Sequence, residues 1–160
     1  WNGLNFSDGR LKEEYPKLVS LLTEQLILKK PAAVFLPYPM DPSPDHMAAC
    51  KALAAALTHS TSHRLLVLSY EIWTPILFPN LLINISDCFH KKKQAISCYK
   101  SEQERYDIIA KAEALGILRA QLTMRHRFQY AEAFKLTDAK QYIAFINQWR
   151  ALSDIEEVNS

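Results

Sequence analysis

The side chains best suited to chemistry lie in one short segment, residues 39–49, with the sequence PMDPSPDHMAA. Ser43 is a good helix N-cap, and the proline after it favours the first position of a helix. Asp45 and His46 then fall in the first turn, where a carboxylate and an imidazole could orient a substrate or bind a metal ion. Two simpler roles stay open: Asp45 as a partner of the helix dipole, and His46 as a surface residue.

A strand and a helix are predicted on either side of this segment. Upstream, residues 32–36 (AAVFL) form an apolar run with the length of a buried parallel strand. Downstream, residues 47–57 (MAACKALAAAL) are rich in alanine and leucine and predict a helix. In an open α/β sheet, ligands bind at the edge where strands end and helices begin. We therefore expect residues 39–49 at a ligand-binding edge.

The rest of the chain alternates in the same way. Further strands are predicted at residues 65–70, 81–85 and 130–134, and further helices at residues 11–29, 86–99, 101–118 and 138–152. This alternation predicts an α/β fold with a mainly parallel sheet flanked by helices. We expect one domain over residues 1–152 and a polar, frayed tail over residues 153–160. So few strands leave an apolar sheet edge open, which indicates N-terminal strands outside this sequence or a partner chain, a second copy included.

Composition excludes several classes of protein. The formal net charge of +2 over 160 residues gives no argument for binding nucleic acid or an anionic membrane. No apolar run is long enough to span a bilayer, and the N-terminus lacks the pattern of a signal peptide. The three cysteines form no CxxC pair, which favours a reducing, cytoplasmic location. The three glycines exclude a GxGxxG dinucleotide loop and a Walker A loop.

Several motifs follow one another in a specific order. They read DGRL, PAAVFLP, DPSPDHMAAC, YEIWTPILFPNLLINIS, KKKQAISCYKSEQ and YAEAF, between about residues 8 and 134. This linked set resembles the LmbE-like, or PIG-L, family of zinc-dependent sugar N-deacetylases. The resemblance implies a Rossmann-like α/β fold, one zinc ion, and removal of an N-acetyl group from an amino sugar or a sugar conjugate.

The resemblance also implies roles for individual residues. The family binds zinc through a His and an Asp of an AHPDDE motif and through the last His of a later HPDH motif, which reads SPDH here. His46 is therefore the implied zinc ligand. Asp45 is an implied catalytic residue that orients a neighbouring histidine or loop, and Ser43 is a second, through a polar contact to substrate. Asp41 and Glu132 are expected in the substrate site, although Glu132 could equally be a structural carboxylate bonded to backbone.

Two departures from the family pattern bear on activity. The sequence has no AHPDDE motif, so two zinc ligands and the general-base aspartate of the family are absent. The leading His of HPDH is Ser43, whose hydroxyl donates a hydrogen bond but does not become a cation. Catalytic zinc takes three protein ligands and keeps a position for water. The zinc site is therefore expected to be incomplete, and this chain alone is expected to bind zinc poorly and to turn over no substrate.

Other residues are weaker candidates for the site. His126 lies between two arginines, which disfavour a metal ion. Tyr70, Glu71 and Trp73, at and after the end of the second predicted strand, could contact a sugar ring, and packing is the simpler role for Trp73. Two readings without catalysis also stay open: a degenerate family member that binds a glycan or a partner, and an α/β domain that serves only assembly.

Overall fold

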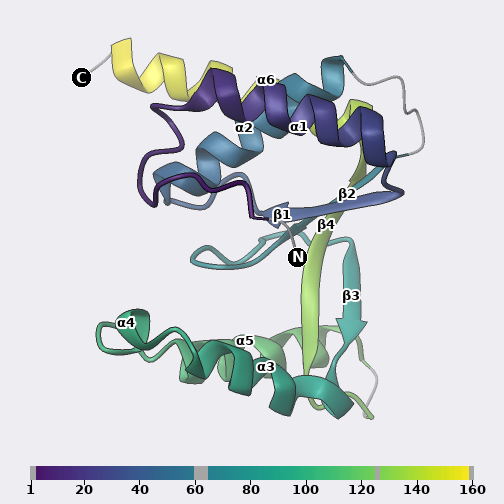
Figure 1. The fold of residues 1–160 in the computed structure, drawn as a ribbon. Helices are drawn as coiled ribbons and strands as arrows, with labels where there is room; N and C mark the ends of the chain where they lie inside the picture. The colour runs from purple at the N-terminus through teal and green to yellow at the C-terminus, as the bar shows by residue number, and fades with distance from the viewer. Residues whose placement is uncertain (1–2, 60–64, 125–126, 159–160) are drawn as a thin grey trace. The chain divides into compact units, whose positions relative to one another are not determined.

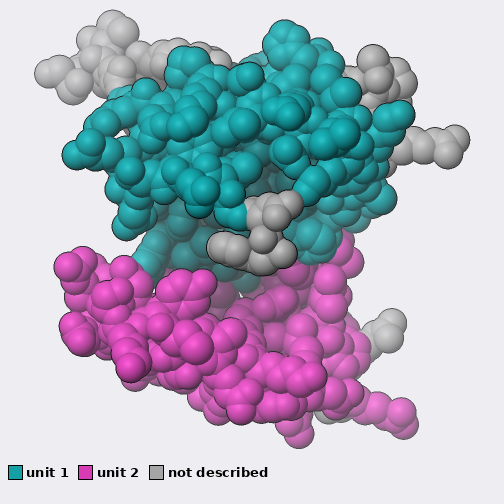
Figure 2. All heavy atoms as spheres, viewed as in Figure 1, with its two compact units in different colours: residues 1–76, 135–160 teal, residues 77–134 magenta. Residues whose placement is uncertain are grey.

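The computed structural model describes residues 3–59, 65–124 and 127–158. Its contacts divide the chain into two compact units (Figure 2). Unit 1 comprises residues 1–76 and 135–160, and unit 2 comprises residues 77–134. The single domain predicted over residues 1–152 stays a prediction. In the part of the chain that the structure describes, no helix has the length and apolar character needed to cross a membrane.

Unit 1 is a parallel strand pair covered by three helices. Its elements are α1 (Tyr15–Lys29), β1 (Ala33–Pro37), α2 (Pro44–Thr58), β2 (Leu66–Tyr70) and α6 (Ala139–Val158). β1 and β2 pair in parallel, from Ala33 opposite Leu66 to Pro37 opposite Tyr70. Parallel strands need a crossover connection, and α2 supplies it. Figure 1 shows α1, α2 and α6 on one side of β1 and β2, and α2 contacts both other helices.

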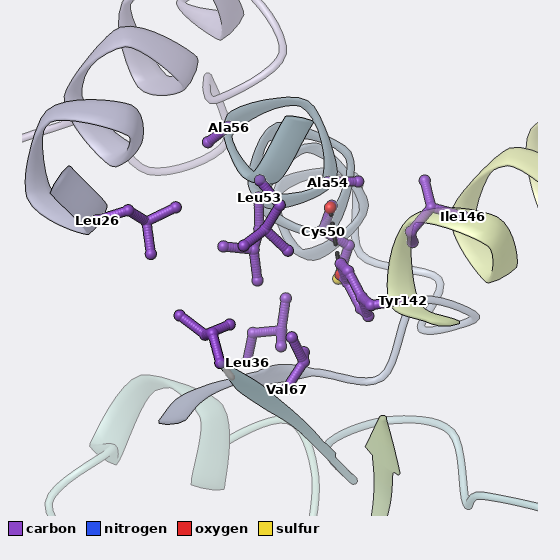
Figure 3. Close-up of a cluster of buried hydrophobic side chains, with 11 residues drawn as sticks. Leu26, Leu36, Cys50, Leu53, Ala54, Ala56, Val67, Tyr142 and Ile146 are labelled. Carbon is purple, nitrogen blue, oxygen red and sulfur yellow. Dashed lines mark hydrogen bonds between the residues drawn. The ribbon is translucent and has the colours of Figure 1, made fainter. Parts of the chain in front are cut away.

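The core of unit 1 lies between these helices and the strand pair. Leu36 of β1 and Val67 of β2 point toward Leu53 of α2, with Leu26 of α1 and Tyr142 of α6 at the sides (Figure 3). Most buried positions of α2 are alanines, which let its neighbours approach closely on several sides. α2 is therefore held on several sides, and its first turn has a fixed position relative to the ends of both strands.

Unit 2 contains the remaining elements. They are β3 (Leu81–Asn84), a short 3-10 turn (Ser86–Cys88), α3 (Phe89–Ser97), α4 (Lys100–Gln103), α5 (Ile108–Leu122) and the first half of β4 (Ala131–Asp138). Phe89 and Tyr130 stack with ring centroids 3.8 Å apart. A Cβ at Gly116 of α5 would lie 3.3 Å from the Tyr130 ring, so glycine allows this close approach.

The predicted fold class is confirmed: the protein is α/β, with a four-stranded sheet flanked by helices. The strand order is β1-β2-β4-β3. β3 and β4 pair in antiparallel fashion, from Leu81 opposite Phe134 to Asn84 opposite Ala131. The sheet is therefore mixed, whereas a mainly parallel sheet was expected: the β1–β2 pair is parallel and the β3–β4 pair is antiparallel.

Several predicted boundaries were wrong, among them the start of the helix predicted from residue 11, which begins at Tyr15. The helix predicted over residues 101–118 is two helices, α4 and α5, because the Asp107 side chain accepts a 2.9 Å hydrogen bond from Ala110 N and caps a new helix. The strand predicted to end at Phe134 continues to Asp138. The tail predicted to fray from residue 153 is helical to Val158, as the continuation of α6.

Truncating the core at Leu53 is predicted to destabilise the protein. Leu53 is 3% exposed, so Leu53→Ala removes buried methyl groups and leaves a cavity that costs about 2–5 kcal/mol. Leu28 is 70% exposed on α1, and Leu28→Ala is expected to change the free energy of unfolding by less than about 0.5 kcal/mol. Urea unfolding of both variants measures the difference, and equal losses would contradict the assigned core.

Stability is also predicted to fall in alkali because of Cys50. The pKa of its thiol is raised from 9.0 to about 12, chiefly by burial, with a smaller lowering by the Tyr142 hydrogen bond and a smaller raising by the nearby charge of Asp41. The unfolded chain therefore loses this proton first, so stability present below pH 9 is lost as the pH rises toward 12, by at most about 1.4 kcal/mol per pH unit. Burial raises the pKa of Tyr142 as well, and its contribution adds above pH 10.

The measurement is urea unfolding between pH 8 and pH 10.5. Cys50→Ala is expected to flatten the loss of stability that begins near pH 9, whatever its effect at neutral pH. Cys98 is exposed. In Cys98→Ala, the free energy of unfolding is therefore expected to fall with pH as steeply as in the wild type. A Cys50→Ala variant with an unchanged slope would show that another group causes the loss.

Candidate functional site

The first turn of α2 builds the candidate site, as its sequence predicts. Ser43 is the N-cap in extended conformation, and its Oγ accepts a 3.4 Å hydrogen bond from His46 N. Pro44 occupies the first helical position, so α2 begins three residues before the predicted helix. The loop before it is fixed as well, because Tyr38 N donates to Tyr70 O of β2 at 2.8 Å. The turn therefore follows directly from the ends of β1 and β2.

Asp41 is the buried centre of this turn. Its side chain has no exposed surface. Oδ1 accepts a hydrogen bond from Ser43 N at 3.1 Å and lies 2.9 Å from His46 Nδ1, and Oδ2 accepts from Trp73 N at 2.8 Å. Two backbone N–H groups and a ring nitrogen of His46 thus surround a carboxylate that was expected to bind substrate, and a contact with substrate stays a prediction.

His46 presents its imidazole at the surface of this turn. Its side chain is 25% exposed, so the ring is neither inside the core nor fully in solvent. Since Nδ1 faces Asp41, Nε2 is the nitrogen left for a ligand. An imidazole with a carboxylate behind one nitrogen is a common arrangement of metal-binding histidines.

Asp45 holds a different part of the chain. Its two carboxylate oxygens accept hydrogen bonds from Gly9 N at 2.7 Å and Leu11 N at 3.1 Å. Gly9 has a φ of +75°, which glycine adopts without strain. Asp45 thus orients a loop, one of the two functions expected of it, while the carboxylate that contacts His46 is Asp41. A catalytic role of Asp45 or Ser43 stays a prediction.

The other candidate residues have partners of their own. Glu132 lies in the unit 2 half of β4 and forms an ion pair with Lys92. Glu71 Oε1 accepts a 2.7 Å hydrogen bond from Ile76 N and so closes the segment after β2. His126 lies outside the described residues. A substrate contact by Glu132 stays a prediction.

The residues of this turn do not form a zinc site by themselves. Within residues 3–59, 65–124 and 127–158, no three His, Cys, Asp or Glu side chains are grouped so that they could hold a metal ion. Three protein ligands are the usual minimum for catalytic zinc. His46 fits the part of one such ligand, and the described residues supply no second and third.

Sequence reasoning missed the contact between Asp41 and Trp73. The two residues are 32 positions apart, and neither has a local pattern that points to the other. The spacing of Asp41 two residues before the N-cap did offer one signal, because aspartate commonly accepts a hydrogen bond from the backbone two residues on.

Comparison with known proteins gives the fold and no family. No protein family model matches the sequence. The conserved protein TT1542 from Thermus thermophilus is similar in structure, with a TM-score of 0.65 and 24% identity over 82% of this chain and 62% of that one. The N,N'-diacetylchitobiose deacetylase from Pyrococcus horikoshii matches with a TM-score of 0.61 and 20% identity over 87% of this chain and 57% of that one.

An enzyme with different chemistry has a similar structure. GalB, the 4-carboxy-2-hydroxymuconate hydratase from Pseudomonas putida KT2440, matches with a TM-score of 0.60 and 18% identity over 76% of this chain and 58% of that one. The chain spans less than two thirds of each of these three structures. It therefore has an α/β fold that occurs in both a deacetylase and a hydratase.

Proposed function

We propose that this chain is part of a zinc-dependent deacetylase of the LmbE-like, or PIG-L, type that removes an N-acetyl group from an amino sugar or a sugar conjugate. The observation that carries the proposal is the imidazole of His46, held by Asp41 at the start of α2 with Nε2 left for a ligand. The fold shared with a chitobiose deacetylase supports it. The ordered motifs of the sequence, SPDH among them, point the same way.

The proposal assigns each residue of the turn a distinct part. His46 is one zinc ligand, and the AHPDDE motif that provides the other two in the family does not occur in these 160 residues. Ser43 Oγ accepts from His46 N as the helix cap, and its O–H can still donate to a substrate oxygen. Asp45 fixes the loop at Gly9 and Leu11 beside the turn. Glu132 and Asp41 remain the proposed contacts to the sugar.

A second candidate function is a binding module without catalysis. The observation that favours it concerns the possible metal ligands. Among the described residues, no three His, Cys, Asp or Glu side chains lie close enough together to hold a metal ion. Ser43 also stands where the family has a histidine, and its oxygen serves as a helix cap. Such a module would bind a glycan or a protein partner with the same turn and would need no zinc.

Removing the imidazole of His46 is predicted to abolish zinc binding and deacetylation by the complete gene product. Changes in the residues around a metal ligand already cost about 10–100-fold in metal affinity or activity, so His46→Ala is expected to lose at least about 100-fold. His59 lies exposed at the other end of α2, and His59→Ala is the matched control that should keep both properties.

The measurements are metal content after dialysis and release of acetate from a panel of N-acetylated amino sugars. Zinc retained by His46→Ala, or acetate released at the wild-type rate, would contradict the proposal. A folded complete protein that binds a glycan but neither zinc nor acetylated substrate would favour the binding module.

Restoring a histidine at position 43 is predicted to raise the turnover of an active enzyme. A preorganised donor to the developing negative charge contributes about 10²–10³-fold in a hydrolase, and a histidine can carry a positive charge where serine cannot. Ser43→His is expected to raise kcat, and Ser43→Ala to lower it. Stability must be followed in parallel, because both changes remove the N-cap and cost about 1 kcal/mol. If Ser43→His has a lower kcat than the wild type at an equal folded fraction, the side chain at position 43 does not lie beside the developing negative charge.

A further inference from the structure

Asp41 connects two segments that are far apart in the sequence. One carboxylate oxygen contacts the first turn of α2 through Ser43 N and His46 Nδ1, and the other accepts from Trp73 N after β2. The side chain is fully buried, so its hydrogen bonds are made to protein groups. Removing such an acceptor leaves buried donors unpaired on both sides, which is costly.

This arrangement favours one of the two ring nitrogens of His46 as the site of the proton. Both oxygens of the Asp41 side chain accept hydrogen bonds from backbone N–H groups, Oδ1 from Ser43 N and Oδ2 from Trp73 N. Nδ1 of His46 lies 2.9 Å from Oδ1, so this ring nitrogen faces a hydrogen-bond acceptor, which favours a proton on Nδ1. In a neutral imidazole the other nitrogen, Nε2, then has the lone pair.

The segment after β2 is a defined unit on the other side of Asp41. Ile76 N donates to Glu71 Oε1 at 2.7 Å, so residues 71–76 close on themselves. Trp73 N, in the middle of this closed segment, makes the hydrogen bond to Asp41 Oδ2. The position of the segment and the orientation of the imidazole thus depend on the same carboxylate.

We infer that Asp41 is a positioning residue that acts through His46: it fixes the imidazole with Nδ1 protonated and Nε2 ready for a ligand, and it ties this ring to the segment of residues 71–76. The functional meaning of the inference rests on the proposed function, in which Nε2 is a metal-binding atom. The inferred tautomer and the link to Trp73 are argued from contacts within this chain, without reference to a metal ion. Substrate contact by Asp41 would then be secondary to this role.

Asp41→Asn tests the inference with little change in shape. An amide has one acceptor oxygen and one NH₂ group, so it can accept on the His46 side or the Trp73 side but not on both. Asp41→Ala removes both acceptors. Asp45→Asn is the matched control, because Asp45 also accepts two backbone hydrogen bonds in the same turn but contacts Gly9 and Leu11 instead.

Two readouts report the two sides of Asp41. Nitrogen NMR of the His46 ring, at a pH at which the spectrum shows a neutral imidazole, gives the tautomer, and hydrogen exchange gives the protection of Trp73 N–H. The wild type is expected to hold the Nδ1–H tautomer in at least about tenfold excess. Asp41→Ala is expected to lose that excess and to speed Trp73 exchange at least about tenfold. Asp41→Asn should change at least one readout, and Asp45→Asn neither.

A wild-type ring protonated at Nε2 would overturn the inference, as would an Asp41→Asn variant with both readouts unchanged. If Asp41→Ala does not fold, the tautomer of the wild type and the two readouts of Asp41→Asn still test the inference. Neither readout needs zinc or substrate, so a complete protein without deacetylase activity would refute the proposed function and leave this inference standing. The reverse result, active enzyme with the other tautomer, would refute only the inference.

Discussion

A buried carboxylate must keep all of its hydrogen-bond donors, and this requirement at Asp41 fixes the geometry of the candidate site. Its partners belong to three places in the fold: the loop after β1, the first turn of α2 and the segment after β2. None of the three can shift far without leaving a donor unpaired in the interior, which costs about 1–3 kcal/mol per group. The imidazole of His46 thereby has a defined orientation, although a quarter of its side chain faces solvent.

The secondary structure around the turn explains why these groups meet. A parallel pair of strands brings the ends of β1 and β2 to the same edge, and the crossover helix begins at that edge. The core of Leu53, Leu36 and Val67 then prevents the helix from sliding along the sheet. Asp45 binds the loop at Gly9 to the same turn, because its carboxylate accepts a hydrogen bond from Gly9 N. The polar side chains of the turn therefore lie at the strand ends, which is where ligands bind in open α/β sheets.

Local patterns predicted much of this arrangement. The N-cap at Ser43, the helix after it and the two apolar strands each depend on a few neighbouring residues, so sequence alone placed them well. The contact of Asp41 with Trp73 depends on tertiary structure and has no local signature. The same reason accounts for the antiparallel pairing of β3 with β4, since a short apolar strand carries no information on its direction. The break between α4 and α5 was missed because the cap at Asp107 competed with an equally plausible start at Ser101.

The cysteines of the protein differ sharply in accessibility. Cys88 and Cys98 are exposed at the two ends of α3, whereas Cys50 is buried with a pKa raised to about 12. Because the thiolate is the reactive form, maleimide dyes should couple to the first two and spare the third. Unit 2 can therefore carry a fluorescent label on the native sequence.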